Sequence, residues 1–303
     1  MNGVAEVAFD PAATFDPAVC SFCGSNSYTT VVSGPTVPIL KCKNCGLMRQ
    51  GWVSDAVKND PIFIDYAGGV ERFQRQRAEK EAAHKGDFLK IADRLEELLP
   101  NKGKLLEIGC AMGGTLVGFR ERGWDVLGVE PEEWTAKIAR EKYGLTVISA
   151  PFQEAGLAKN SFDAIILLHV IEHVSDPFQA LCDMMELIRP GGYLVLETPR
   201  YDTPSFMLLR GRERSVIPQH LHYFTRKSML MICNKAGYDA RRVEAVGRTV
   251  TLDRLAFYFA KFLRSKEATK TITKMSDALH LNDVRVHINL HDMMRLYLQK
   301  KVA

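Results

Sequence analysis

Apolar runs and amphipathic stretches alternate through the middle of the chain. Residues 162–168 are almost continuously apolar, as expected for a central parallel strand that is buried on both faces. The alternation predicts a doubly wound α/β sheet with its ligand at the carboxyl ends of the strands. The expected strands are 105–108, 125–129, 146–149, 162–168 and 192–197, and the expected helices are 115–122, 131–143 and 177–187.

The alternation breaks after Tyr201. Residues 252–280 are rich in aromatic side chains and predict a helical insertion before the last strand, near 250–285. These aromatic residues favour ordinary packing or a homodimer contact over a lipid-binding wall. The other elements expected in this part are a helix at 228–236, a strand at 241–246 and a final strand at 293–298.

The first expected strand of this sheet leads into a glycine-rich loop. Glu107 stands two residues before Gly109, and Gly113 precedes the next helical pattern. Glycines let the main chain turn tightly and approach a ligand. An acidic residue here repels a pyrophosphate and attracts a cation, which favours the sulfonium and ammonium groups of S-adenosylmethionine over a dinucleotide. Glu130, about 20 residues further on, is where such a fold places the carboxylate that holds ribose hydroxyls.

Several segments carry a family resemblance. They are the loop at 107–113, Ser-Phe-Asp at 161–163, His-Val-Ile-Glu-His-Val-Ser-Asp-Pro at 169–177, Arg-Pro-Gly-Gly at 189–192 and Pro-Gln-His-Leu-His-Tyr-Phe-Thr at 218–225. The chain thereby resembles the class I S-adenosylmethionine-dependent methyltransferases, in the branch of the ubiquinone-biosynthesis O-methyltransferases and sugar methyltransferases. The first motif of that family is (D/E)-x-G-x-G-x-G, and Ala111 replaces its middle glycine. The resemblance implies a Rossmann-like seven-stranded sheet and S-adenosylmethionine as cofactor.

We expect the methionine end of the cofactor at the glycine loop and its ribose at the end of the second strand. The loop after the third strand should approach the adenine, and the end of the fourth strand should close the pocket. The residues expected to bind the cofactor are Glu107, Gly109, Cys110, Ala111, Gly113, Glu130, Pro131, Phe152, Gln153, Leu168 and His169.

Histidines near the carboxyl edge of the sheet are candidates for a catalytic base, because imidazole titrates near neutral pH. His220 and His222 lie on the segment 218–225, which is expected to fold over the acceptor as a lid, and one of them is the first candidate. His173 beside Glu172 is the second candidate. That pair could instead orient a loop or bind a divalent metal.

Two Cys-x-x-Cys-Gly pairs stand near the N-terminus. Cys20, Cys23, Cys42 and Cys45 have the spacing of a four-cysteine zinc ribbon, with short strands at 28–32 and 37–40 between the pairs. Four thiolates leave no open coordination position, so we expect the zinc to be structural. The expected division of the chain is a flexible tail at 1–18, the zinc ribbon at 19–50, a helical connector and cofactor cap at 51–100, and the methyltransferase domain at 101–303.

The bulk properties describe an ordinary globular protein of 303 residues with a mild net charge of +4. The sequence shows no apolar run long enough to span a membrane and no basic leader, so cytoplasm is the expected location. The leading function is methyl transfer to a small-molecule acceptor, a hydroxyl or carbon of a sugar, glycolipid or natural product. RNA methylation with the ribbon as the RNA-binding module is the alternative, and the mild charge makes nucleic acid the less favoured partner. A scaffold without activity is the third hypothesis, which the intact loop and Glu130 oppose.

Overall fold

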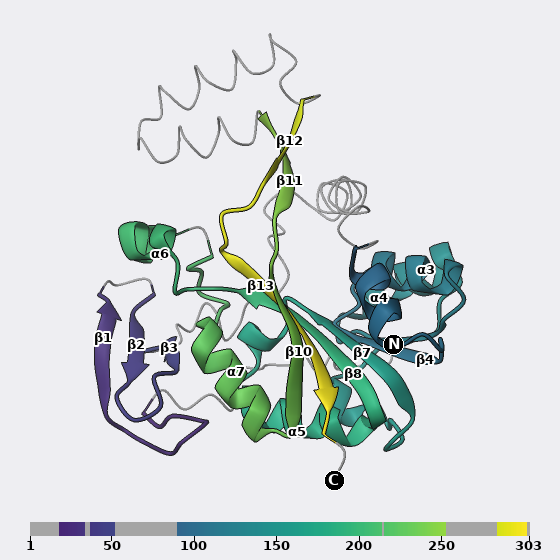
Figure 1. Ribbon diagram of the computed structural model, residues 1–303, viewed down its shortest axis with the longest axis horizontal. Coiled ribbons are helices and arrows are strands. Elements are labelled where there is room, and N and C mark those ends of the chain that lie inside the picture. Colours follow the sequence, from purple (N-terminus) through teal and green to yellow (C-terminus); the bar gives the residue numbers. More distant parts are fainter. Residues whose placement is uncertain (1–17, 34–36, 52–89, 214, 253–283, 302–303) are drawn as a thin grey trace, which may run out of the picture.

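The computed structural model of the chain describes residues 18–33, 37–51, 90–213, 215–252 and 284–301. A seven-stranded sheet forms its centre, and a small four-stranded sheet lies beside it (Figure 1). The expected tail at 1–18 except for its last residue, the connector at 52–89 and nearly all of the 252–280 insertion lie outside the described residues.

The large sheet has the strand order β10-β13-β8-β7-β4-β5-β6. Its strands β8, β7, β4, β5 and β6 run parallel, while β13 is antiparallel to both of its neighbours. This confirms the doubly wound, seven-stranded α/β fold. The strands are β4 (Lys104–Ile108), β5 (Asp125–Val129), β6 (Val147–Ile148), β7 (Phe162–Leu168), β8 (Ile188–Pro199), β10 (Tyr238–Ala245) and β13 (Met293–Lys300).

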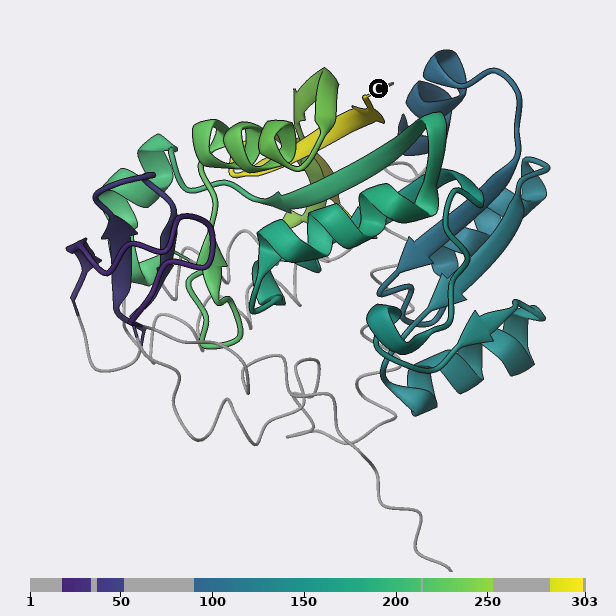
Figure 2. The same cartoon turned by 90° about the horizontal axis from the view of Figure 1, so that it is seen from below.

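Helices cover both faces of this sheet because neighbouring strand residues point to opposite sides. Leu105 packs with the helix at 90–98, α3 and α4, whereas Leu106 packs with α5 and α7. Figure 2 shows helices on both sides of the sheet. Both faces are apolar, which explains why β7 reads as a continuous apolar run. The helices are α3 (Gly114–Glu121), α4 (Glu133–Tyr143), α5 (Pro177–Leu187), α6 (Pro204–Leu209) and α7 (Arg226–Lys235).

Local capping signals determine where α5 and α7 begin. The carboxylate of Asp176 accepts hydrogen bonds from the main-chain N–H groups of Phe178 and Gln179, and Pro177 occupies the first helical position. Thr225 and Ser228 form a reciprocal capping box at α7. This cap starts α7 two residues earlier than the predicted helix at 228–236.

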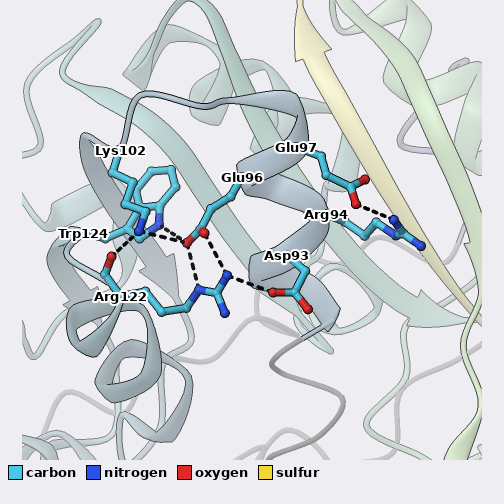
Figure 3. A network of polar contacts seen from close by, with 7 residues as sticks. All are labelled: Asp93, Arg94, Glu96, Glu97, Lys102, Arg122 and Trp124. Carbon is cyan, nitrogen blue, oxygen red and sulfur yellow. Dashed lines mark hydrogen bonds and ion pairs between the residues drawn. The ribbon is translucent and has the colours of Figure 1, made fainter.

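The helix at 90–98 is attached by a cluster of charges around Arg122, the residue that ends α3 (Figure 3). The guanidinium of Arg122 donates to both carboxylate oxygens of Glu96, at 2.9 and 2.8 Å, and to Asp93 at 2.8 Å. The indole N–H of Trp124 also donates to Glu96, at 3.1 Å. This turn of the helix is therefore fixed near the start of β5. The described end of the connector packs on the core, and its predicted role as a cofactor cap stays a prediction.

The four-stranded sheet has the order β1-β2-β3-β9 and joins two distant parts of the chain. Its strands are β1 (Tyr28–Val32), β2 (Ile39–Cys42), β3 (Met48–Gln50) and β9 (His222–Tyr223). The strands β3 and β9 were not predicted, since each is too short to show a period. A second unpredicted pair, β11 (Arg248–Thr251) and β12 (Arg285–Ile288), flanks the region of the expected insertion.

Candidate active site

The predicted cofactor residues gather at one edge of the large sheet. They lie at or just after the carboxyl ends of β4, β5, β6 and β7, which are adjacent in the order β7-β4-β5-β6. Phe152 and Gln153 form a 3-10 turn after β6, with Phe152 partly buried and Gln153 exposed. Pro131 and Leu168 are partly buried at the ends of their strands. The topology therefore brings together residues that lie up to 62 positions apart (107 to 169) in the sequence.

Glu130 fixes the shape of the glycine loop. Its carboxylate is 3% exposed and accepts hydrogen bonds from the N–H of Ala111 at 2.7 Å and from that of Glu132 at 3.1 Å. A carboxylate can accept more than one hydrogen bond on each oxygen, and hydroxyls are suitable donors. Ala111 has φ +47, in the left-handed region that favours glycine. The hydrogen bond to Glu130 helps to hold it there.

Two of the loop glycines are required by close packing. A Cβ at Gly109 would lie 2.5 Å from Cγ2 of Val170, and a Cβ at Gly113 would overlap the side chain of Leu145. Both residues also have positive φ. The loop thus lies directly against the segment that follows β7. The missing side chain at Gly113 lets Ala139 of α4 and Leu145 pack closely against the loop. Gly113 therefore has a structural role in addition to its predicted cofactor role.

The loop has a negative electrostatic environment. Burial raises the pKa of the Cys110 thiol, and the carboxylates of Glu107 and Glu130 raise it further. Glu107 is 4% exposed. Cys110 is therefore a neutral thiol and not a nucleophile. Two buried carboxylates at a glycine turn suit the ammonium and sulfonium of S-adenosylmethionine, so the residues present fit that cofactor.

His169 stands at the end of β7 between two carboxylates. Its Nδ1 is 3.6 Å from Oε1 of Glu172, and its Nε2 is 3.4 Å from Oε1 of Glu197. The side chain of His169 is 52% exposed, and the two carboxylates stabilise its charged form and raise its pKa. His169 is therefore a cation and cannot serve as a base at neutral pH. Arg295 forms a buried ion pair with Glu197 at 2.6 Å.

Glu172, His173 and His220 form a compact cluster next to this pair. One ligand atom of each lies within 4.8 Å of the others, and the two imidazole rings meet edge to face with centroids 4.8 Å apart. Glu172 is fully buried, His173 is 9% exposed and His220 is 6% exposed. The hydroxyl of Thr198 donates to Glu172 at 3.0 Å. The structure thus unites a histidine from each of the two predicted base segments.

Hydrogen bonds assign the tautomers of both histidines. Nδ1 of His173 lies 2.9 Å from the carbonyl of Gln219, so it carries a proton. The hydroxyl of Tyr201 donates to the carbonyl of Ser215 at 2.8 Å, and therefore accepts from Nδ1 of His220 at 3.1 Å. Each ring then has its lone pair on Nε2, where it can accept a proton or bind a divalent cation.

Burial keeps these two imidazoles neutral. It lowers the pKa of His173, and it lowers the pKa of His220 to about 3 together with the nearby His173. For Glu172, burial would raise the pKa, but the ion pair with His169 outweighs it and lowers the pKa to about 2. The cluster thus combines one carboxylate with two neutral imidazoles.

His222 lies outside this cluster. It is fully buried, its Nε2 is 3.4 Å from Oγ of Ser21, and its ring stacks on Phe224. In the segment 218–225, which was expected to fold over the acceptor as a lid, Leu221 to Phe224 are buried and β9 is part of the four-stranded sheet. Its place over the acceptor stays a prediction. His222 contacts the ribbon, so its predicted role as a base loses its geometric support.

Sequence reasoning missed three participants. The sequence did contain a signal for Glu197, because a charged residue near the end of a strongly apolar strand indicates a functional position. Tyr201 follows the end of the same strand. Arg295 lies within β13 and becomes visible only when β13 pairs with β8, with Arg295 opposite Glu197.

The four cysteines of the ribbon come together as predicted. Sγ of Cys20 is 3.6 Å from that of Cys45, and Sγ of Cys23 is 3.6 Å from that of Cys42. All four sulfur atoms lie within 4.8 Å of one another. For Cys42, burial opposes ionisation, but hydrogen bonds from the main chain of Cys45 and Asn44 outweigh it and lower the pKa to about 6. Four converging thiols with main-chain donors suit tetrahedral zinc.

Comparison with known proteins agrees with this geometry. A family profile described as a methyltransferase domain matches residues 73–243, more than half of the 303-residue chain. The chain is 31% identical over 154 residues to a ubiquinone biosynthesis O-methyltransferase of Cereibacter sphaeroides, which covers 46% of this chain and 62% of that relative. The chain therefore spans less than two thirds of the length of this relative. A relative with the same name from Leptothrix cholodnii is 26% identical over 157 residues, covering 47% of this chain and 67% of its own.

A solved structure supports the same fold. An S-adenosylmethionine-dependent methyltransferase of Thermotoga maritima superposes with a TM-score of 0.51 at 22% identity, covering 76% of this chain and 97% of its own. Among the residues that the structure describes, no helix is long and apolar enough to cross a membrane. The matched profile and the sheet order lead to one conclusion: the chain belongs to the methyltransferase domain family.

Proposed function

We propose that the protein transfers a methyl group from S-adenosylmethionine to a hydroxyl or carbon of a small molecule, such as a sugar, a glycolipid or a natural product. One observation carries this proposal. The acidic glycine loop and the Glu172–His173–His220 cluster lie side by side, because Val170 packs against Gly109 two residues before Glu172. A cofactor site and a group that accepts protons thus share one edge of the sheet. The name of the Cereibacter sphaeroides relative favours an oxygen acceptor.

In this proposal Glu107 and the loop bind the methionine end of the cofactor, and Glu130 accepts hydrogen bonds from ribose hydroxyls. Pro131, Phe152, Gln153 and Leu168 line the rest of the cofactor site. Bound S-adenosylmethionine supplies a methyl group activated by its sulfonium. The chain's own part is to align the acceptor in line with that methyl and to take up its proton.

His173 and His220 are the groups that we propose for the proton. Both are neutral at pH 7, and each has a lone pair on Nε2. Glu172 stabilises the imidazolium that forms when either ring accepts the hydroxyl proton of the acceptor. His169 is a positioning residue, since its cation holds the carboxylates of Glu172 and Glu197 in place.

The same cluster can hold a divalent cation. One carboxylate and two imidazoles are ligands that such a cation accepts, and their atoms already lie within 4.8 Å of one another. A bound cation would act on the acceptor hydroxyl by lowering its pKa. A chelator too weak to remove the zinc of the cysteine ribbon, with the zinc content checked by elemental analysis, separates the two chemistries. Turnover by a base alone persists in the chelator, whereas turnover that needs the cation stops and returns when the metal is added.

We also propose that Cys20, Cys23, Cys42 and Cys45 hold one structural zinc ion. A ribbon of this size buries little apolar surface by itself, so the metal would supply much of its folding free energy. Four thiolates fill the coordination sphere, which leaves no position for a substrate.

The direct test is calorimetry of the full chain with S-adenosylmethionine, its demethylated product and NAD. We expect micromolar binding of the first two, the range in which many cofactor sites operate, and no binding of NAD. A Glu130→Gln variant serves as the matched control, because it keeps the shape of the side chain and removes its charge. Absence of binding by the wild-type chain would refute the proposal.

Labelled-methyl transfer to a panel of small hydroxyl compounds and to total RNA then addresses the acceptor. Incorporation into RNA at physiological salt would favour the RNA alternative. Incorporation into a small molecule alone would support the proposed acceptor class. No described feature of the structure favours RNA over a small molecule.

A further inference from the structure

The cysteine ribbon and the histidine cluster are connected through a few residues. Strand β3 of the ribbon pairs with β9, with Met48 opposite Tyr223 and Arg49 opposite His222. His220 lies two residues before β9. The ribbon therefore forms one sheet with the segment that supplies one of the two proposed proton acceptors.

Main-chain hydrogen bonds complete this connection. The N–H of Gln50 donates to the carbonyl of Leu221 at 2.9 Å, and the N–H of Leu221 donates to the carbonyl of Glu172 at 2.9 Å. Leu221 thus links the ribbon to the carboxylate residue of the cluster. Its main chain also sets the position of the preceding residue, His220.

Side chains beside the thiols make further contacts with the same region. Ser21, between Cys20 and Cys23, contacts His222. Phe22 meets Phe178 of α5 edge to face, with ring centroids 5.4 Å apart, and Nζ of Lys235 on α7 lies 5.0 Å from the centroid of the Phe22 ring. The cysteine loop 20–23 is therefore the docking surface of the ribbon on the domain.

The thiols belong to the core of the domain as well. Cys20 and Cys42 are 1% exposed and pack in the same apolar cluster as Ile171, the residue before Glu172, and Phe224. Arg49 is 1% exposed and donates to the carbonyl of Val19 and to the hydroxyl of Tyr28. Without the metal, the four thiols would repel one another or repack within this apolar cluster. Because the cluster is closely packed, the change would reach neighbours such as Ile171 and Phe224.

We propose that metal bound by the four cysteines positions His220 for the reaction, so that metal loss disconnects β9 and disables proton acceptance while cofactor binding persists. The cofactor residues lie at the ends of β4, β5, β6 and β7, and the ribbon pairs with none of these strands. This inference rests on the proposed function of the cluster and on the proposed zinc. It assigns the ribbon a part in the reaction beyond its own folding.

Hydrogen exchange of the full-length protein tests the proposal without any acceptor. Zinc is removed from the wild-type chain with a chelator and restored afterwards, and exchange is followed in peptides spanning 46–51 and 217–224. We expect exchange in both peptides to rise by about tenfold or more on zinc removal and to return when zinc is restored, as for a cooperative local opening. The affinity for S-adenosylhomocysteine should change by less than about threefold, equivalent to less than about 0.7 kcal/mol.

Two variants serve as matched tests. Phe22→Ala keeps all four thiols and weakens the docking, so it should accelerate exchange at 217–224 by about two- to tenfold with zinc still bound. Cys182→Ser changes a partly buried cysteine of α5 that is not one of the four proposed zinc ligands, and it should leave exchange unchanged. Because Phe22→Ala keeps the four zinc-binding thiols, the test does not depend on variants of those cysteines, which could fail to fold.

Two results would overturn the proposal. One is unchanged exchange at 217–224 after zinc has left, which would mean that β9 holds His220 without the metal. The other is loss of S-adenosylhomocysteine binding together with faster exchange, which would make the ribbon a support for the whole fold. If the zinc-loaded wild-type chain does not bind S-adenosylhomocysteine, the proposed function fails. The exchange measurement then still decides whether the metal holds β9 in place.

Discussion

Acid should destabilise the protein through His222, and the size of the effect follows from its burial. Burial lowers the pKa of His222 to about 3 in the folded chain, with the nearby Arg49 acting in the same direction. An unfolded histidine has a pKa of about 6.5. Below about pH 6.5 the unfolded state therefore binds a proton that the folded state does not, and stability falls as the pH falls.

Linkage gives the magnitude. Between pH 7 and pH 5, a group with these two pKa values removes about 2 kcal/mol of folding free energy. His220, whose pKa is also about 3, contributes a similar loss. His169 acts in the opposite direction, because its raised pKa contributes stability that is fully present below about pH 6.5 and is lost as the pH rises through that raised pKa. The pH dependence of the unfolding free energy of the wild-type chain is the sum of these contributions. The difference between a variant and the wild-type chain therefore isolates the contribution of one histidine.

The variant His222→Gln removes the titrating group and keeps a polar side chain. Urea unfolding at pH 7, 6 and 5 should show a loss of stability that is smaller than in the wild-type chain by about 2 kcal/mol across this range. Ser21→Ala is the matched control. It removes the hydroxyl contact at a cost of about 1 kcal/mol at every pH and should leave the pH dependence unchanged. Equal pH dependence in His222→Gln and the wild-type chain would refute the reasoning, since His222 would then titrate alike in both states.

Four other sites of the structure give one prediction each. Glu130→Ala should weaken S-adenosylmethionine binding by about 1–3 kcal/mol in calorimetry, because it removes a buried acceptor, and an unchanged affinity would contradict its role. Elemental analysis should find one zinc per chain, and Cys45→Ser should lower that content, whereas thiols that react freely in the native wild-type protein would argue against a bound metal. Glu96→Gln should cost about 1 kcal/mol at pH 7, and because its bond to Arg122 lowers the pKa of Glu96, the difference should vanish in thermal scans as the pH falls through that pKa. His220→Ala should lower turnover by about 10²–10⁴-fold and retain cofactor affinity, and full turnover would transfer the role to His173.

Much of the large sheet could be predicted from residue patterns, because its strands are apolar on both faces and its helices have apolar stripes. The grouping of the four thiols could also be predicted, because each Cys-x-x-Cys-Gly turn holds its two sulfur atoms close together. Ala111 shows where a motif departure has a physical consequence. Its N–H binds Glu130 while its φ of +47 costs on the order of 1 kcal/mol, so the loop keeps its shape without a middle glycine.

The sequence by itself determined the alternation of strands and helices in the large sheet, the acidic loop and the cysteine spacing, because these depend on local periodicity and short spacing. Only the tertiary structure decided which histidines meet. His220 and His222 are two residues apart, a spacing that would put both side chains on one face of a regular strand. His220 instead lies in the turn before β9, where its N–H donates to the carbonyl of Ile217 at 3.1 Å, so the two side chains meet different neighbours. The pairing of β9 with β3 then places His222 against Ser21 of the ribbon and His220 beside His173 and Glu172. That pairing joins residues more than 170 positions apart, and its short strands carry too few residues for any pattern to reveal it.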